Sequence, residues 1–270
     1  MIGIASISII PIRREPSERS EMVSQVLFGE LYDVLEETEK WIRIKLYHDE
    51  YEGWIDIKMH QELSTEVASL FLENDKSIDK FYTKDAFSIV KKEGDYSNML
   101  IAAGSILPFF DKDSKSFRLG DDKYKLISSA SDTMCLSGSN SCEQVILKAL
   151  SYYNAPYLWG GRTPFGIDCS GLTQMVFRAI GYNLKRDASM QVMQGEELMF
   201  FEESQIGDLA FFGDANAITH VGIIWEDGRI IHASGKVRID KIDHQGIYNE
   251  SLRRYTHHLK SIRRIISTTK

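Results

Sequence analysis

The sequence predicts a protein of the α+β class, in which two small all-β units precede a larger domain of mixed structure. Three observations carry this prediction. The first 130 residues contain short β-type runs separated by turn signals. A serine-rich stretch at 128–140 then interrupts the pattern. Beyond it, two helical patterns come first and several β-type runs follow, an order typical of antiparallel α+β domains rather than of alternating α/β domains.

The first β unit is predicted to cover residues 1–60. Its β-type runs are Ala5–Ile12, Leu31–Glu36, Trp41–Tyr47 and Tyr51–Ile57. Gly29 precedes the second run, Trp41 opens the third, and a Gly-Trp pair ends at Trp54. Bacterial SH3-like barrels have this order, and this part of the chain resembles them.

A helical connector is expected over residues 61–79, because Leu63, Val67 and Leu70 recur at helical spacing. Residues 80–130 return to β-type runs separated by glycines, which predicts a second SH3-like barrel. Its runs are Ala86–Val90, Met99–Ala102, Ser105–Phe109, Ser116–Leu119 and Tyr124–Ile127. The two β units together form a weak internal repeat.

The third domain is predicted to span residues 131–270. Ser128–Asn140 is the expected linker, and Ser141 is the expected N-cap of a helix that runs to Tyr153. A second helix is expected over 171–180, closed by Gly181. The predicted strands follow at Asp208–Phe212, His220–Trp225, Arg229–Ala233, Val237–Ile242 and His258–Ile266.

Composition excludes several classes of function. The chain is 43% hydrophobic and 26% charged, as in globular proteins with an ample core. Its net charge of −7 argues against nucleic acid or an anionic membrane as the main partner. Cys135, Cys142 and Cys169 form neither a disulfide framework nor a zinc spacing, which favours a reducing compartment. We expect a cytoplasmic protein, or a periplasmic or secreted one if a signal peptide has been removed.

Cys169 is the candidate nucleophile. It lies between Asp168 and Ser170 at the start of the second predicted helix, where the helix dipole favours a thiolate. His220 and His232 follow in predicted strands. A cysteine, a histidine base and a polar group that orients the base make up the pattern of cysteine nucleophiles. A single helical cysteine is more often a small buried residue, but these polar neighbours favour catalysis.

The loop between the two histidine strands decides whether both histidines can act together. A three-residue loop, Glu226–Gly228, would pair Gly222 with His232 and place His220 on the same face of the sheet. A two-residue loop would place the histidines on opposite faces. A catalytic pair therefore requires the three-residue loop or a bulge.

The C-terminal half resembles the NlpC-type family of bacterial cell-wall cysteine peptidases, which have a papain-like core. The matching motifs are Tyr157-x-Trp-Gly-Gly-Arg162, Asp168-Cys-Ser-Gly171, Arg186-Asp-Ala-Ser-x-Gln191, Gly207-Asp-Leu-Ala-Phe-Phe212, His220-Val-Gly-Ile223 and Ile231-His-Ala-Ser-Gly235. With two SH3-like barrels in front, the whole chain resembles the dipeptidyl-peptidase VI type, the γ-D-glutamyl-L-diamino acid endopeptidases. One departure is Leu184-Lys185, where many relatives have a proline before the arginine.

The resemblance implies hydrolysis of the bond between the side-chain carboxyl of D-glutamate and the diamino acid of peptidoglycan-derived peptides. Peptides with a free N-terminal L-alanine would be preferred, and the diamino acid could be diaminopimelate or lysine. Cys169 would attack the carbonyl, His220 would transfer the proton, and His232 would orient His220.

The resemblance also implies a set of substrate-binding residues. Asp168 would pair with the substrate's ammonium group, and Ser170 and Ser189 would hold the peptide. Glu21 and Tyr51 of the first barrel would close the end that receives L-alanine. Plainer alternatives are that Asp168 is a helix N-cap and that Glu21 and Tyr51 are solvated surface residues.

No other histidine has ligand spacing to cysteines or carboxylates, so neither a metal nor another cofactor is expected. His257 and His258, beside Arg253 and Arg254, indicate an exposed basic patch. Two other functions remain open. One is an inactive module that binds cell-wall peptides, and the other is an acyltransferase on the same core, which would favour a hydrophobic acyl groove.

Overall fold

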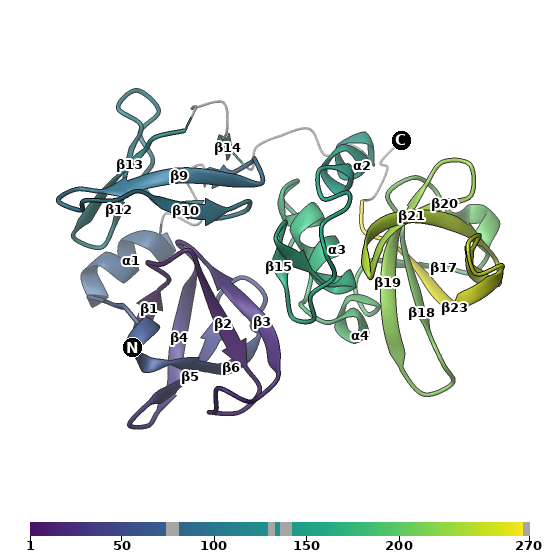
Figure 1. Ribbon diagram of the computed structural model, residues 1–270, viewed down its shortest axis with the longest axis horizontal. Helices are drawn as coiled ribbons and strands as arrows, with labels where there is room; N and C mark the ends of the chain where they lie inside the picture. Colours follow the sequence, from purple (N-terminus) through teal and green to yellow (C-terminus); the bar gives the residue numbers. More distant parts are fainter. Residues whose placement is uncertain (74–80, 129–132, 136–141, 267–270) are drawn as a thin grey trace. The chain divides into compact units, whose positions relative to one another are not determined.

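The computed structural model describes residues 1–73, 81–128, 133–135 and 142–266. The chain divides into two compact units, Met1–Gly138 and Ser139–Lys270. Among the described residues, the first unit contains β-sheets and one α-helix, and in the second unit the helices precede the main sheet along the sequence (Figure 1). The α+β order predicted from the sequence is confirmed.

The first unit begins with an antiparallel sheet of strand order β3-β2-β6-β5-β4-β1-β7. Its strands are β1 (Ile2–Ile4), β2 (Ile9–Arg13), β3 (Met22–Leu27), β4 (Leu31–Glu37), β5 (Trp41–Leu46), β6 (Glu52–Asp56) and β7 (Glu62–Leu63), with a 3-10 turn at Ile57–Met59. Successive side chains of a strand point to opposite faces, so every second one reaches the core. Ile10 and Ile12 in β2 and Ile42 and Ile44 in β5 are buried in this way between partly exposed neighbours.

Two strand predictions in this sheet were wrong. The predicted run Ala5–Ile12 is broken after β1, because the Ala5 N–H donates to the Glu30 carbonyl and the Ala5 carbonyl accepts from Gly29. Strand β3 was missed. It buries Ser24 and Gln25 beside apolar neighbours, so its sequence lacks the alternation that marks a strand.

Residues 81–128, with 133–135, form two smaller sheets, ordered β10-β9-β13-β12 and β11-β8-β14. Their strands are β8 (Phe81–Thr83), β9 (Phe87–Lys92), β10 (Met99–Ala102), β11 (Ile106–Leu107), β12 (Ser116–Leu119), β13 (Asp122–Leu126) and β14 (Thr133–Cys135). These sheets share a core with the first one: the Phe28 ring lies edge-on to Phe117 and Tyr124, with centroids 5.9 and 5.6 Å apart. The domain boundaries predicted inside this unit stay predictions.

The predicted connector and linker are described only in part. Helix α1 (Thr65–Glu73) lies inside the connector, whose residues 74–79 fall outside the described residues. Strand β14 lies inside the predicted linker and pairs with β8. Linker residues 129–132 and 136–140, and the predicted N-cap Ser141, also fall outside the described residues.

The second unit places its helices on a closed sheet. The helices are α2 (Cys142–Leu150), α3 (Cys169–Arg178) and α4 (Ala188–Gln191), with a 3-10 turn at Phe201–Glu203. A hairpin, β15 (Arg162–Thr163) with β16 (Gly166–Ile167), precedes α3. The sheet order is β17-β23-β18-β19-β20-β21-β22, and β22 also pairs with β23, so the strands from β18 to β23 close into a barrel. Every residue of α3 is buried, and α3 contacts β19 and β20.

The strands of this sheet are β17 (Glu196–Leu198), β18 (Leu209–Gly213), β19 (Ile218–Trp225), β20 (Arg229–Ser234), β21 (Lys236–Asp243), β22 (Gly246–Asn249) and β23 (Arg254–Arg264). Strands β18 to β21 agree with the sequence prediction, whereas β17 was not predicted. Strand β22 was not predicted, and β23 starts at Arg254 rather than at His258. Among the described helices, none has the length and apolar character needed to cross a membrane.

Candidate active site

Cys169 is the first residue of α3, and the residue before it caps the helix. Asp168 has extended backbone geometry, and its carboxylate accepts a 2.7 Å hydrogen bond from the Gly171 N–H. Gly171 is required here, because a Cβ at this position would lie 2.3 Å from the Gly161 carbonyl oxygen. The helix start and the Gly160-Gly161 turn therefore pack backbone against backbone, and they fix where the thiol lies.

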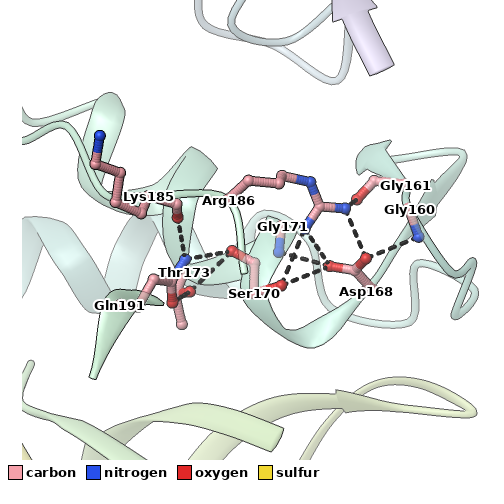
Figure 2. A network of polar contacts seen from close by, with 9 residues as sticks. All are labelled: Gly160, Gly161, Asp168, Ser170, Gly171, Thr173, Lys185, Arg186 and Gln191. Atoms are coloured by element: carbon pink, nitrogen blue, oxygen red, sulfur yellow. Dashed lines mark hydrogen bonds and ion pairs between the residues drawn. The ribbon is translucent and has the colours of Figure 1, made fainter. Parts of the chain in front are cut away.

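The Asp168 carboxylate also has an arginine partner in the same unit. Arg186 donates to both of its oxygens, at 3.0 and 2.6 Å, and Gly160 N–H donates to one of them at 2.8 Å (Figure 2). Both charged groups are buried. The N-cap alternative for Asp168 is confirmed, and this carboxylate is neutralised before any substrate ammonium arrives.

Ser170 and Gln191 extend the same network toward α4. Ser170 Oγ accepts from Arg186 at 2.9 Å and donates to Asp168 at 3.3 Å. The Gln191 amide donates to the carbonyls of Ser170 and Lys185, at 2.9 and 2.8 Å (Figure 2). The segment carrying Arg186 is thereby tied to the first turn of α3.

The Cys169 thiol is buried, and burial followed by the Asp168 carboxylate raises its pKa to about 12. Hydrogen bonding from the Val221 N–H and the charge of Arg186 oppose this rise. The expectation of a low-pKa thiolate was therefore wrong for the free protein. The helix terminus is outweighed by burial, so the sulfur is a thiol at neutral pH and requires a base. The Val221 contact places that sulfur beside the strand that carries His220.

His220 and His232 lie on adjacent strands, as the catalytic pattern requires. Gly222 pairs with His232 across β19 and β20, which leaves Glu226–Gly228 as a three-residue loop. The three-residue loop is confirmed. His220 Nε2 lies 2.9 Å from His232 Nδ1, and both rings are buried. The remaining ring nitrogen of His220, Nδ1, is then the atom available to take a proton from a thiol.

Asp240 extends the two histidines into a hydrogen-bonded series, Asp240–His232–His220, here called the histidine chain. Asp240 was not identified from the sequence. Its Oδ2 lies 3.0 Å from His232 Nε2, and its Oδ1 accepts from Arg238 at 2.8 Å. The two residues lie two positions apart on β21, the strand next to His232. This strand was predicted, so two charged residues on one face beside a candidate histidine were a usable signal.

His257 is also part of the site, so the predicted exposed basic patch was wrong for this residue. Its ring stacks on His220, with centroids 4.2 Å apart and an interplanar angle of 27°. Strand β23 starts earlier than predicted and carries His257 onto the barrel beside β18 and β22. Burial and the neighbouring His232 lower the pKa of His257 to about 4. Burial, His232 and His257 together hold the pKa of His220 well below its usual value.

Comparison with known proteins identifies the family of each domain. Residues 154–256 match the model of the NlpC/P60 family, and residues 12–58 match that of the bacterial dipeptidyl-peptidase SH3 domain. The second unit is an NlpC/P60 domain. The chain is thus a cysteine peptidase of the NlpC/P60 family with an SH3-like domain in front of the peptidase domain.

Individual relatives extend the comparison. The chain is 28% identical over 225 residues to a γ-D-glutamyl-L-lysine dipeptidyl-peptidase of Bacillus subtilis, which covers 78% of this chain and 71% of the relative. It is 35% identical over 116 residues to dipeptidyl-peptidase 6 of Lysinibacillus sphaericus, over 41% of this chain and 40% of that protein. The crystal structure of an NlpC/P60 family protein from Bacillus cereus matches with a TM-score of 0.81 at 18% identity, over 99% of this chain and 100% of the other. This last likeness concerns the fold.

The NlpC/P60 domain brings together most of the residues expected to act in it. Cys169, Asp168 and Ser170 lie at the start of α3, and Ser189 is an exposed residue of α4. His220 and His232 lie on the barrel strands that α3 contacts. Among the described residues, no cluster of histidine, cysteine or carboxylate side chains has the arrangement of a metal site.

Glu21 and Tyr51 belong to the SH3-like unit. The exposed Glu21 side chain lies 3.0 Å from Arg14. Tyr51 is partly buried against the core of the first sheet. Their expected role at the L-alanine end of a substrate stays a prediction.

Proposed function

We propose that this NlpC/P60 peptidase hydrolyses the bond between the γ-carboxyl of D-glutamate and the diamino acid of peptidoglycan-derived peptides with a free N-terminal L-alanine. The observation that carries the proposal is the order of groups around Cys169: a buried thiol at a helix start, next to the strand of His220, with His232 behind that base. Two relatives named for γ-D-glutamyl dipeptidyl-peptidase or dipeptidyl-peptidase activity support the choice of substrate.

In the proposed hydrolysis, Cys169 is the nucleophile and His220 acts as base and then as acid. His220 Nδ1 takes the thiol proton while the sulfur bonds to the γ-carbonyl carbon. The carbon–nitrogen bond then breaks, His220 returns the proton to the departing amine, and a thioester remains on Cys169. Water attacks the thioester with His220 as base, which releases the carboxylate and restores the thiol. Because the pKa of the thiol is raised and that of His220 is lowered, both groups rest in their neutral forms.

Recognition of the free amine cannot depend on an unpaired Asp168, because Arg186 already holds both of its oxygens. Within the proposal, Asp168 still contributes negative charge near the nucleophile, although Arg186 offsets it. Glu21 is the second carboxylate proposed for the ammonium group. The Glu21 carboxylate pairs with Arg14, whose side chain is largely exposed, so the pair is screened by solvent.

The decisive experiment uses L-Ala-γ-D-Glu-diaminopimelate, its lysine counterpart, and N-acetylated versions of both. We expect the free-amine peptides to be cleaved and the acetylated ones to be about 30-fold or more slower in kcat/KM, because a charge-assisted contact is lost. Cys169→Ala is the matched control for contaminating peptidases, and mass analysis of the products identifies the cleaved bond. Equal rates for free and acetylated peptides, or efficient digestion of intact peptidoglycan, would contradict the proposal.

A requirement for a free L-alanine amine restricts where such an enzyme can work. In intact cell wall the sugar lactyl group caps that amine, so the substrate must be a released fragment. We therefore place the enzyme in the cytoplasm, where it recycles wall peptides. Fractionation of native cells, with a cytoplasmic and a periplasmic marker enzyme followed in parallel, checks this location. Recovery of the protein with the periplasmic marker or in the culture medium would overturn it.

A further inference from the structure

Asp240 and Arg238 form the far end of the histidine chain, and the role inferred for them rests on the proposed peptidase function. Asp240 bonds to His232, which in turn bonds to the base His220. The Asp240 side chain is only 7% exposed, and its two oxygens have different partners, His232 on one side and Arg238 on the other. Because each oxygen of this buried carboxylate has its own partner, the direction of its hydrogen bond with His232 can be deduced.

We propose that Asp240, held by Arg238, is a positioning residue that sets the tautomers of both histidines, so that His220 presents an unprotonated Nδ1 to Cys169. A carboxylate can only accept hydrogen bonds, so the nitrogen of His232 that faces it must carry the hydrogen. A neutral imidazole has one N–H, which leaves His232 Nδ1 as an acceptor. His220 Nε2 then donates to it, and the lone pair remains on His220 Nδ1.

The ionised state of Asp240 supports this direction of the hydrogen bonds. Burial raises its pKa, but the hydrogen bonds from His232 and Arg238 outweigh burial and hold the pKa below its usual value. The carboxylate is therefore ionised throughout the neutral range and remains an acceptor. When His220 becomes an imidazolium during the reaction, the negative charge behind His232 also favours that state.

Arg238 makes the inference testable through Asp240→Asn. In this variant the amide oxygen must stay on Arg238, because guanidinium groups only donate. The amide NH2 then faces His232 Nε2 and forces the opposite tautomer. Replacing Arg238 as well frees the amide to turn its oxygen toward His232. A residue that only held the fold together would show no such reversal.

The experiment compares Asp240→Asn, Arg238→Met and the double variant. We expect Asp240→Asn to lower kcat about 10- to 100-fold with KM nearly unchanged, and Arg238→Met alone to lower it only slightly. In the Asp240→Asn background, Arg238→Met should raise kcat. Asp243→Asn is the matched control, since Asp243 lies on the same strand and bonds to Tyr255 instead. Melting temperatures identify any variant that has not folded.

Two further readouts do not depend on the substrate. Nitrogen NMR of the histidine rings should show Nε2–H tautomers for His220 and His232 in the wild type and an Nδ1–H form of His232 in Asp240→Asn. Alkylation of Cys169 by iodoacetamide, mapped by mass spectrometry, should slow in Asp240→Asn. Unchanged tautomers together with an unchanged alkylation rate would overturn the inference even if the proposed peptide is not the substrate. Failure of the peptide assay alone would overturn only the proposed function.

Discussion

The active site has two halves that use polar groups in opposite ways. At the helix half, Asp168, Arg186 and Ser170 form a closed network in which the carboxylate accepts from two backbone N–H groups and from the two terminal guanidinium nitrogens of Arg186. At the strand half, Asp240, His232 and His220 form a hydrogen-bonded chain, and its direction follows from the tautomers proposed for the two histidines. The closed network ties down the first turn of α3, which carries the thiol. A directed chain can take a proton up and return it.

The largest expected effect is at the point where the two halves meet. Cys169→Ala should abolish turnover, because a single thiol carries the covalent step. His220→Ala should be equally severe, whereas His232→Ala should retain some activity because the base survives without its orienting partner. Rates of peptide cleavage by the purified variants measure this order. Cys142→Ala, which removes a thiol outside the site, serves as the control and should leave the rate nearly unchanged.

Appreciable cleavage by Cys169→Ala would remove the covalent mechanism. A His232→Ala enzyme as fast as the wild type would move the orienting role to another residue. Either result would also contradict the different roles assigned to the helix half and the strand half.

The second-largest effect should distinguish the two halves through the stability of the protein rather than through the rate of cleavage. Arg186→Met leaves the Asp168 charge buried with neutral donors only, so we expect a loss of about 3–5 kcal/mol in the free energy of unfolding. Asp168→Asn in the same chain removes that charge and should recover much of the loss. Denaturant unfolding of the single and double variants measures both. His232→Gln, at the strand half, is the comparison variant. It should lower the rate of peptide cleavage while changing the free energy of unfolding only a little.

If Arg186→Met unfolded at the wild-type denaturant concentration, the helix network would not be structural. Its arginine would then be available for a direct role in binding.

The smallest effect concerns the pH range of the base. The pKa of His220 is held below 6.5, so the base form persists as pH falls below that value and activity is lost only at the lowered pKa. His257→Phe keeps a ring on His220 but removes one group that lowers this pKa, so the acid limb of kcat/KM should move to higher pH. The pH profile of kcat/KM measures the change. His258→Phe, its exposed neighbour on β23, is the control. An acid limb that stays in place would mean that His257 has no electrostatic effect on the base.

Much of the strand half could be predicted from local sequence. The order of Cys169, His220 and His232 matches a known family, and strand periodicity with a three-residue loop placed both histidines on one face. Such features depend on nearest neighbours along the chain. The SH3-like unit was likewise predictable in outline, although the polar residues Ser24 and Gln25 concealed β3.

By itself, the sequence determined the fold class, and it placed the candidate nucleophile at a helix start and the two candidate histidines on one face of neighbouring strands, because motif spacing and strand alternation are local. Only the tertiary structure decided the Arg186 partner of Asp168, the burial that raises the thiol pKa and the stacking of His257 on His220. The physical reason is closure of the barrel and burial of α3. Closure pairs β23 with β18 and β22 and so brings His257 to His220, and burial sets the electrostatics that residue order does not contain.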